Sequence, residues 1–219
     1  MNKNITTQNT NNNLPGIFIV FEGIDGSGKS TLAEELYCEL NERGIPVILT
    51  SEPYKSGFGA DVRNLFKKHD GVLSVNTELF LFEAARVEHV NNVIIPALEE
   101  GKIVICDRFA DSTYSYQGID KNASETILEL NKIATGGLLP NITFLIDTDV
   151  DLAMSRSKKS DSKDFLCKSE YQRIRNAYLD LASKNPERYC VISGDETIPK
   201  LMDIILSEIE KEKYWRKEA

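Results

Sequence analysis

Cysteine and histidine are scarce in this sequence of 219 residues, and they lie far apart. No two cysteines have the C-x-x-C spacing of a zinc site or a redox pair. The cysteines are Cys38, Cys106, Cys167 and Cys190, and the histidines are His69 and His89. The sequence therefore excludes a zinc-finger pattern and gives no sign of a disulfide framework. This usage is typical of a reduced compartment, so we expect a cytoplasmic protein.

Long hydrophobic segments are also missing. The longest apolar run is residues 17–21, whereas a helix that spans a membrane needs about 18 to 20 apolar residues. We therefore expect no membrane partner. Residues 2–13 hold six asparagines and lack the apolar segment of a signal peptide. We predict that residues 1–13 are a disordered tail and that residues 14–219 form a single domain.

The sequence has no excess of positive charge. It has 26 Lys+Arg against 34 Asp+Glu, which gives a net charge of -8 and a pI of about 5.0. Proteins that bind nucleic acids usually carry a basic patch and a high pI, so we expect no nucleic-acid partner. A small phosphate ligand is not excluded, because a local site can be basic on an acidic protein. The hydrophobic content of 41% is ordinary for a globular protein.

Apolar strands alternate with amphipathic helices along the chain. Short apolar, largely β-branched runs predict strands at residues 17–21, 46–50, 103–106, 142–146 and 189–192. Apolar residues at helical spacing predict helices at residues 32–43, 78–100, 122–135, 151–156, 171–181 and 198–214. Thr77 is the expected N-cap of the second of these helices. The alternation predicts an α/β fold with a five-stranded parallel sheet flanked by helices on both faces.

A glycine-rich turn carries a nucleotide-binding motif. Residues 23–30 match the pattern G-x-x-x-x-G-K-[ST] between a predicted strand and a predicted helix. In this motif the backbone N–H groups wrap phosphate, Lys29 reaches the β- and γ-phosphates, and the Ser30 hydroxyl ligates Mg²⁺. A turn without a ligand is the alternative, which the flanking strand and helix disfavour. We therefore expect a three-layer P-loop NTPase fold that binds ATP through Gly23, Ile24, Asp25, Gly26, Ser27, Gly28, Lys29, Ser30 and Thr31.

Other segments narrow the class of P-loop protein. A GTPase usually adds Asn-Lys-x-Asp, whereas residues 131–134 read Asn-Lys-Ile-Ala within a predicted helix. The sequence has no Leu-Ser-Gly-Gly-Gln-like signature of a transporter ATPase. Asp107 and Arg108 follow the predicted strand 103–106, and ligands of open parallel sheets bind beyond the carboxyl ends of strands. We therefore expect Asp107 and Arg108 beside the P-loop of a small kinase, rather than as a solvated surface pair.

Four segments between residue 17 and about residue 209 together resemble the thymidylate kinase family. They are FEGIDGSGKST at residues 21–31, SEP at residues 51–53, LFEAARVEHV at residues 81–90 and DRFADSTYSYQG at residues 107–118. The resemblance implies an enzyme that transfers the γ-phosphoryl group of ATP to dTMP with Mg²⁺, giving ADP and dTDP for dTTP biosynthesis. It also implies a homodimer. The apolar helix around residues 79–95 is a candidate interface, although burial in the monomer core explains it equally well.

The resemblance assigns roles to matching residues. Phe82 would stack on thymine and Arg86 would hydrogen-bond the edge of the base; their i, i+4 spacing places both on one helix face. Arg108 would hold the monophosphate or the transferring group, and Asp25 would meet the sugar 3′-hydroxyl or the metal shell. The further implied dTMP contacts are Glu52, Pro53, Thr113, Tyr116 and Gln117, and the implied catalytic set is Lys29, Arg108, Asp25 and Asp107. Arg156 would bind ATP beside a lid at about residues 157–168 that contains Lys158, Lys159 and Lys163.

The cations of this chain depart from the family pattern. Members often carry Arg-Glu-Pro-Gly-Gly-Thr where residues 51–56 read Ser-Glu-Pro-Tyr-Lys-Ser, so one arginine is missing and Lys55 is the candidate substitute. A catalytic arginine is also absent from the P-loop and from residues 161–164, which read Asp-Ser-Lys-Asp. Lysine is a point charge and cannot make the bidentate clamp of an arginine. The cation that stabilises the transferring group therefore stays open.

The residues also allow other interpretations. Phe82 is otherwise core packing, Arg86 a surface ion pair with Glu83 or Glu88, and Tyr116 a half-buried aromatic. The rival functions are a kinase for another small acceptor, such as a deoxynucleoside or a different nucleoside monophosphate, an ATP-dependent conformational regulator, and a structural P-loop protein. The second pocket expected around Phe82 and Arg86 favours a nucleotide kinase, because a regulator has no need of a second nucleotide pocket.

Overall fold

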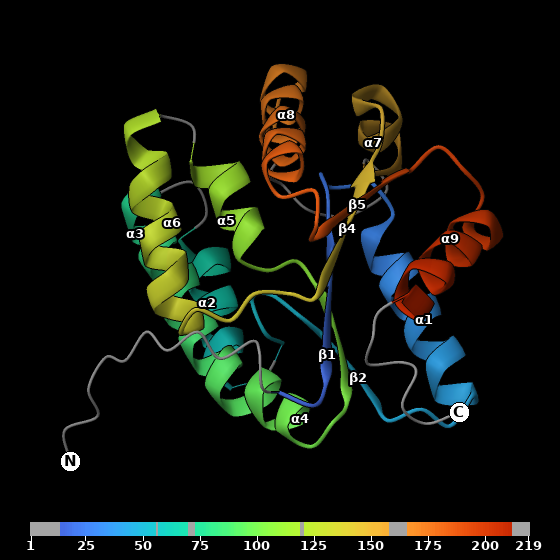
Figure 1. Ribbon diagram of the computed structural model, residues 1–219. Coiled ribbons are helices and arrows are strands. Elements are labelled where there is room, and N and C mark those ends of the chain that lie inside the picture. The colour runs from blue at the N-terminus through green and yellow to red at the C-terminus, as the bar shows by residue number, and fades with distance from the viewer. Residues whose placement is uncertain (1–13, 56, 70–72, 119–120, 158–165, 212–219) are drawn as a thin grey trace, which may run out of the picture.

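The computed structural model describes residues 14–55, 57–69, 73–118, 121–157 and 166–211. Its five strands are β1 (Ile17–Glu22), β2 (Val47–Ser51), β3 (Ile103–Asp107), β4 (Ile142–Asp147) and β5 (Tyr189–Ser193). They form one parallel sheet in the order β2-β3-β1-β4-β5 (Figure 1). The predicted α/β fold with a five-stranded parallel sheet is confirmed. The predicted tail at residues 1–13 lies outside the described residues.

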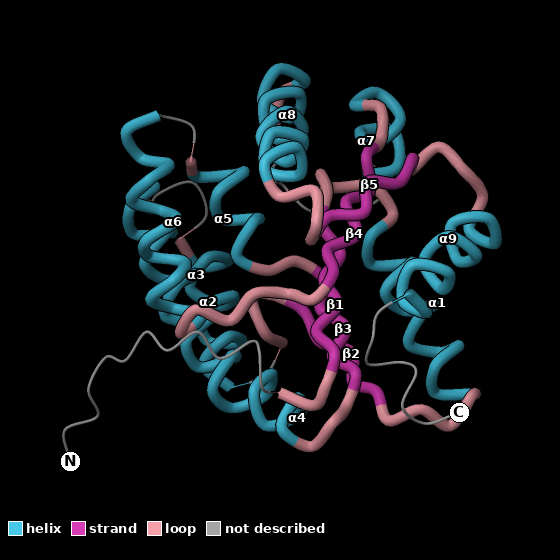
Figure 2. Tube along the Cα trace, in the orientation of Figure 1, coloured by secondary structure: helices cyan, strands magenta, loops and turns pink. Residues whose placement is uncertain are grey.

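Helices cover both faces of this sheet (Figure 2). They are α1 (Lys29–Glu42), α2 (Gly57–Lys68), α3 (Val75–His89), α4 (Ile95–Glu99), α5 (Ala110–Gln117), α6 (Lys121–Thr135), α7 (Val150–Ser157), α8 (Lys168–Lys184) and α9 (Ile198–Lys211). Helices α1 and α9 lie on one side, and α2, α3, α5 and α6 lie on the other. No helix in the described part of the chain is both long enough and apolar enough to cross a membrane.

Strand β1 shows why the sheet needs both helical layers. Alternate residues of a strand point to opposite faces. Ile19 and Phe21 pack with Leu36 of α1, whereas Phe18 and Val20 pack with residues of the α3–α4 side, such as Ile94. All six residues of the strand are buried. The continuous apolar run in the sequence is therefore the consequence of a strand that has no solvent face.

The long helix predicted at residues 78–100 begins earlier and changes form inside. Its N-cap is Ser74, whose hydroxyl accepts a hydrogen bond from the backbone N–H of Thr77. The prediction of Thr77 as the cap was wrong: both residues have a hydroxyl, and the extended backbone occurs at Ser74. A π-helical turn, η1 (Val90–Ile94), separates α3 from α4. Pro96, which cannot donate a backbone hydrogen bond, follows that turn.

Two helices were not predicted from the sequence, and both border the ends of strands. Helix α2 follows β2 after residue 56, and α5 begins directly after β3 and Arg108-Phe109. The P-loop connects the end of β1 to α1 in the same region. The carboxyl ends of three neighbouring strands, β2, β3 and β1, therefore meet the starts of α1, α2 and α5.

Candidate active site

The P-loop takes a shape that only glycine allows at one position. Gly26 has a φ of 81°, and a Cβ atom built there would lie 2.1 Å from the carbonyl oxygen of Ala153 in α7. A contact this short with backbone cannot be relieved by moving a side chain. The loop is therefore packed against α7. Any side chain at residue 26, including an arginine, would clash with this backbone.

Lys29 is buried at the start of α1 and turns back over the P-loop. Its Nζ donates to the carbonyl oxygen of Ile24 at 3.2 Å and lies 3.6 Å from Oδ1 of Asp25. Burial, together with the nearby Arg108, lowers the pKa of Lys29 to about 8. A phosphate oxygen would offer this buried cation a stronger acceptor than a carbonyl oxygen.

Ser30 and Asp107 form an oxygen-rich pair across the ends of α1 and β3. The Ser30 hydroxyl donates to Oδ2 of Asp107 at 2.5 Å, whereas the buried Oδ1 of Asp107 has no hydrogen-bond partner among the described residues. No cluster of three His, Cys, Asp or Glu residues that could hold a metal occurs in the described ranges. Mg²⁺ usually takes one or two protein oxygens and completes its shell with water and substrate phosphate. The donor set therefore fits Mg²⁺ bound together with a nucleotide.

Arg108 lies at the centre of the site in a left-handed backbone conformation, with a φ of 70°. Its Nη2 donates to Oδ1 of Asp25 at 2.5 Å and to the Tyr116 hydroxyl at 3.1 Å. Burial alone would raise the pKa of Asp25, but Arg108 and Lys29 lower it to about 2. The side chain of Arg108 is 17% exposed. The placement predicted from the sequence, beside the P-loop, is confirmed.

A cavity of about 470 Å³ opens over these charges. Its lining includes Asp25, Lys29, Ser30, Glu52, Pro53, Phe82, Arg86, Asp107, Arg108, Thr113, Tyr116 and Gln117. Every residue that the sequence suggested for dTMP thus borders the same space. Of the other ATP candidates, Thr31 is exposed, and Arg156 donates to the carbonyl oxygen of Gly194 after β5 at 3.0 Å. Lys158, Lys159 and Lys163 lie outside the described residues.

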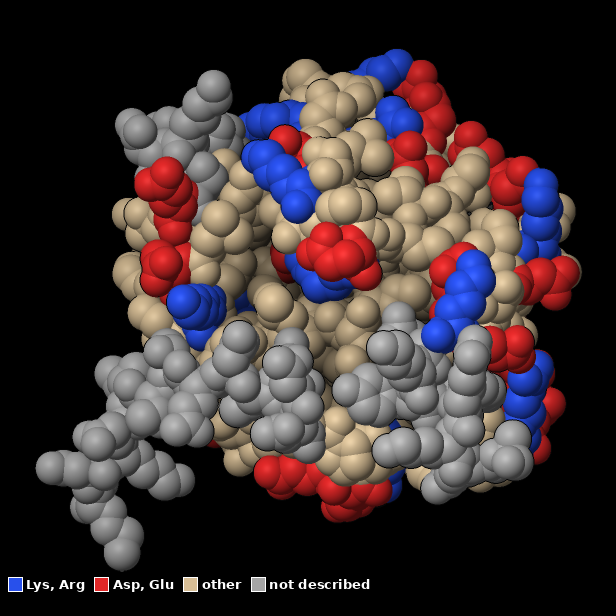
Figure 3. Space-filling view, in the orientation of Figure 1, with Lys and Arg blue, Asp and Glu red and all other residues tan. Residues whose placement is uncertain are grey.

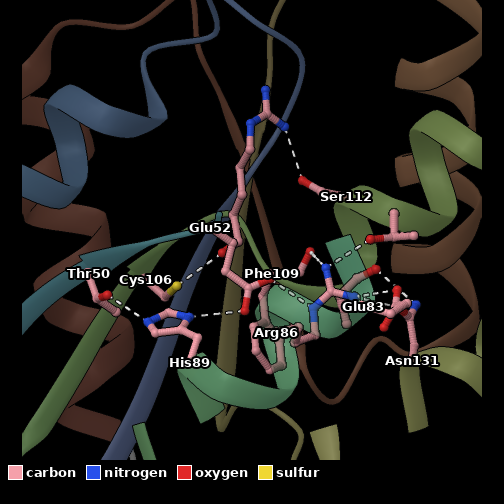
Figure 4. A network of polar contacts seen from close by, with 12 residues as sticks. Thr50, Glu52, Glu83, Arg86, His89, Cys106, Phe109, Ser112 and Asn131 are labelled. Carbon is pink, nitrogen blue, oxygen red and sulfur yellow. Dashed lines mark hydrogen bonds and ion pairs between the residues drawn. The ribbon is translucent and has the colours of Figure 1, made fainter. Parts of the chain in front are cut away.

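Arg86 is 3% exposed and is held from four directions (Figure 4). It donates to Glu52 Oε2 at 2.8 Å, Glu83 Oε1 at 2.6 Å, Asn131 Oδ1 at 2.9 Å and Thr113 Oγ1 at 2.8 Å. Burial alone would lower the pKa of Arg86, but the two carboxylates raise it. The alternative interpretation as a surface pair with Glu83 or Glu88 was wrong, because the pair with Glu83 is buried. Glu52 is fixed in turn by His89, whose Nδ1 lies 3.1 Å from Glu52 Oε1.

Comparison with known proteins identifies the family of the chain. The family model for thymidylate kinase matches residues 21–205. The chain belongs to the thymidylate kinase family. It is 38% identical over 199 residues to the thymidylate kinase of Symbiobacterium thermophilum, covering 89% of this chain and 93% of that protein. It is 37% identical over 205 residues to that of Pelobacter propionicus, covering 89% and 94%.

The fold agrees with a solved thymidylate kinase. The crystal structure of the enzyme from Ehrlichia chaffeensis matches with a TM-score of 0.73 and 37% sequence identity, covering 89% of this chain and 98% of that chain. The P-loop NTPase fold predicted from the sequence is thereby confirmed. The chain is an ATP-dependent kinase of dTMP, and its two substrates are ATP and dTMP.

Three polar residues of this thymidylate kinase site were not predicted. Arg63 of α2 lines the cavity and donates twice to the carbonyl oxygen of Pro53, at 2.8 and 2.6 Å. Asn131 accepts a hydrogen bond from Arg86, and Glu22 is buried close to Arg108. Asn131 was visible only as part of a GTPase-like segment, and Arg63 belongs to a helix that the sequence did not predict. No short motif indicates either role: Asn131 lies 45 residues from Arg86, and Arg63 reaches Pro53 from a helix that the sequence did not predict.

Phe82 combines two interpretations that the sequence left as alternatives. Its ring lies 4.7 Å from that of Phe66, so it packs against α2 as a core aromatic would. It is also half-buried and lines the cavity. Packing against Phe66 holds the ring in place, and the exposed part is available to a planar ligand.

Proposed function

We propose that dTMP binds in the 470 Å³ cavity with its phosphate toward Arg108 and its base toward Phe82 and Arg86. The observation that supports this orientation is the distribution of charge in the cavity. Lys29 and Arg108 lie at the P-loop end, whereas Phe82 lies with Arg86 on α3. Phosphoryl transfer needs positioning and neutralisation of charge more than covalent help. Lys29 and Arg108 supply that neutralisation.

The carboxylates of the site orient its cationic side chains. Asp25 holds Arg108 and Lys29 in the free enzyme, and on binding it meets the sugar 3′-hydroxyl or the metal shell. Ser30 and Asp107 would hold Mg²⁺, with Ser30 as the P-loop ligand. The bound metal would supply positive charge that neutralises the phosphates. ATP occupies the P-loop residues 23–31, with Arg156 near its outer end.

The base is recognised by one N–H of Arg86 that has only a long hydrogen bond within the protein. Arg86 Nη2 donates to Thr113 at 2.8 Å, but its contact with the Phe109 carbonyl oxygen is 3.5 Å. The other Arg86 donors make contacts of 2.6 to 2.9 Å. This Nη2 hydrogen is therefore the donor that a thymine carbonyl would take with least loss. Tyr116 and Gln117 line the sugar side of the cavity, together with Glu52 and Pro53 at the end of β2.

Lys55 and Arg63 are the candidates for the missing phosphate clamp. Both line the cavity. Arg63 lies on α2, outside residues 51–56 where the family pattern has its arginine. Lys158, Lys159 and Lys163 would add charge from the lid at about residues 157–168, within a single domain of residues 14–219. Closure of that lid would exclude water and prevent loss of ATP to hydrolysis.

The acceptor can be tested with a panel of nucleotides. We expect ADP release in a coupled assay to be fastest with dTMP and far slower with dUMP, dCMP, AMP and thymidine. A charged phosphate and a thymine edge are both needed to fill the cavity. Thymidine accepted as well as dTMP would support the rival deoxynucleoside kinase. Release of ADP that no acceptor stimulates would support the ATP-dependent regulator.

The enzyme acts in the cytoplasm as a homodimer and has no nucleic-acid or membrane partner. Its product, dTDP, serves the synthesis of dTTP. Among the described residues, ten large apolar side chains are exposed, and six of them lie on α2, α3 and α6. Those six are Phe58, Leu65, Val75, Phe80, Leu128 and Ile133. Basic and acidic side chains are interspersed on the face seen in Figure 3. All four cysteines are unpaired, in keeping with a reducing compartment.

A further inference from the structure

Glu22 is a buried carboxylate that the phosphoryl transfer described above does not use. It is the last residue of β1, directly before the P-loop, and it is 0% exposed. Its Oε1 accepts from the backbone N–H of Phe109 at 2.8 Å. Its Oε2 accepts from the Ser112 hydroxyl at 2.7 Å and the Tyr178 hydroxyl at 2.9 Å. Glu22 thus joins β1 to α5 and α8.

The same two hydroxyls contact Arg108. Nη1 of Arg108 donates to Ser112 Oγ at 3.1 Å and to the Tyr178 hydroxyl oxygen at 3.2 Å. Figure 4 labels Ser112 and marks this contact of its hydroxyl with a dashed line. An ionised carboxylate can only accept hydrogen bonds. It therefore draws the hydroxyl hydrogens toward itself and leaves the oxygen lone pairs for the guanidinium.

Glu22 also fixes the backbone on which Arg108 sits. Arg108 has a φ of 70°, a conformation that costs a non-glycine residue free energy. The next N–H in the chain, that of Phe109, is the one bound by Glu22 Oε1. One carboxylate therefore holds the turn that carries Arg108 and orients the hydroxyls that hold its head group.

We propose that Glu22 is a positioning residue that acts through Arg108, holding the guanidinium in the orientation needed for dTMP phosphorylation. The inference rests on the proposed role of Arg108. Burial of a carboxylate is costly, and it raises the pKa of Glu22 to about 7, with a further increase from Asp111 and an opposing effect from Arg108. The titratable and charged groups around Glu22 are Arg108, Asp111, Lys29, Cys106 and the tyrosines Tyr178 and Tyr189.

The test is Glu22→Gln, which keeps the shape of the side chain but removes its charge. We expect kcat/KM for dTMP to fall by about 10- to 100-fold, as when a partner that orients a functional group is removed. The KM for ATP should change little. The matched control is Asn141→Ala, which removes an acceptor of a backbone N–H at the opposite end of β1, where Asn141 Oδ1 binds the N–H of Phe18 at 2.7 Å. The control should keep kcat/KM.

A double-mutant cycle separates this inference from the role of Arg108 itself. If Glu22 acts through Arg108, Glu22→Gln should add less than about threefold to the loss caused by Arg108→Ala. Multiplicative losses would overturn the inference and leave the role of Arg108 intact. If Arg108→Ala keeps wild-type use of dTMP, the proposed role of Arg108 fails first. If Glu22→Gln does not fold, the same cycle is run with Ser112→Ala/Tyr178→Phe, which removes both bridging hydroxyls.

The pH dependence gives a readout that a merely structural role would not move. The ratio of kcat/KM for dTMP between wild type and Glu22→Gln cancels the titration of the substrate phosphate. We expect this ratio to rise between pH 5.5 and pH 8, as the wild-type carboxylate ionises. A ratio that stays flat over this range would overturn the inference.

Discussion

The chemistry proposed for this site depends on single charged side chains, and most of them are buried. Lys29, Arg86 and Glu22 are each at most 5% exposed. A buried charge is tolerated when it is paired and hydrogen-bonded, and removal of one partner leaves the other uncompensated. Substitutions here are therefore expected to act both on turnover and on folding. Each prediction at this scale needs a readout that distinguishes the two effects.

Lys29→Ala should lower kcat by at least about 100-fold, a loss typical of removing a preorganised donor from a transition state. The domain should stay folded, because Lys29 makes one hydrogen bond, to Ile24, and one ion pair, with the half-exposed Asp25. Coupled ADP release and thermal unfolding measure the two effects. The control is Lys184→Ala, which breaks only a surface pair with Asp180. A Lys29→Ala enzyme with wild-type kcat would refute the P-loop role.

Arg86→Ala should change which base is accepted. Thymine presents a carbonyl acceptor where cytosine presents an amino donor, and arginine has only donors. We expect the wild type to prefer dTMP over dUMP by roughly 10- to 200-fold, the value of one methyl group, and to use dCMP far less. Arg86→Ala should flatten the contrast between dTMP and dCMP and leave that between dTMP and dUMP.

The ratios of kcat/KM among the three acceptors measure this selectivity, and they do not depend on how much protein is folded. Arg188→Ala is the matched control, because it also removes a largely buried arginine from an ion pair, with Asp111. It should keep the wild-type ratios. An unchanged ratio of dTMP to dCMP in Arg86→Ala would show that another group reads the base.

Glu22 should make stability depend on pH in the weakly acidic range. Its folded pKa of about 7 lies above its ordinary value, so the unfolded chain loses this proton first as the pH rises. The free energy of unfolding should therefore fall between about pH 4.5 and pH 7, by at most about 3 kcal/mol from this residue. Urea unfolding of wild type and Glu22→Gln at pH 5 and pH 8 measures it. From pH 5 to pH 8, the wild type should lose stability relative to the variant. The same difference in unfolding free energy between the two proteins at pH 5 and pH 8 would contradict the prediction.

At the scale of elements, helix α3 depends on a cap that its sequence leaves ambiguous. Ser74 accepts the N–H of Thr77, and the two hydroxyls also lie 2.9 Å apart. Ser74→Ala should cost about 1 kcal/mol of unfolding free energy, the usual value of an N-cap. Thr77→Ala should cost clearly less, because the backbone N–H and its acceptor both stay. The urea midpoints of the two variants test this, and a larger loss in Thr77→Ala would show that Thr77 is the cap.

The elements that the sequence missed share a physical reason. Helix α5, with the sequence ADSTYSYQ, is polar and only eight residues long, so it lacks a clear apolar stripe. Helices this short are marginal by themselves and depend on tertiary packing. Helix α2 begins Gly-Phe-Gly, which disfavours a helix locally. Both helices supply cavity residues, including Arg63 and Thr113, so the missed elements are also those that complete the site.

For the whole molecule, the exposed apolar side chains of α2, α3 and α6 predict an assembly. Phe80 is 60% exposed and lies on α3, the helix that packs against both α2 and α6. Phe80→Glu should convert the proposed dimer to a monomer, because a charge cannot be buried unpaired in an apolar interface. Sedimentation velocity measures the change. Val191→Glu, on β5, is the control and should stay dimeric; a monomeric wild type at micromolar concentration would refute the dimer.

The sequence by itself determined the strands, the P-loop and the family of this protein. Strands β1, β3 and β4 are largely apolar runs because they are buried on both faces, and that burial is visible in the local composition. The P-loop is a contiguous motif, since one turn supplies all of its backbone donors. Local patterns of this kind need no knowledge of distant residues.

Only the tertiary structure decided how the charges of the site are partnered. Arg86 meets side chains from residues 52, 113 and 131, and Glu22 meets Ser112 and Tyr178. The strand order places the carboxyl ends of β2, β3 and β1 side by side, which brings Glu52, the start of α5 and Glu22 together. A sequence shows which charges are present, but the pairing of buried charges is set by long-range packing, because each must find its partner within hydrogen-bond distance.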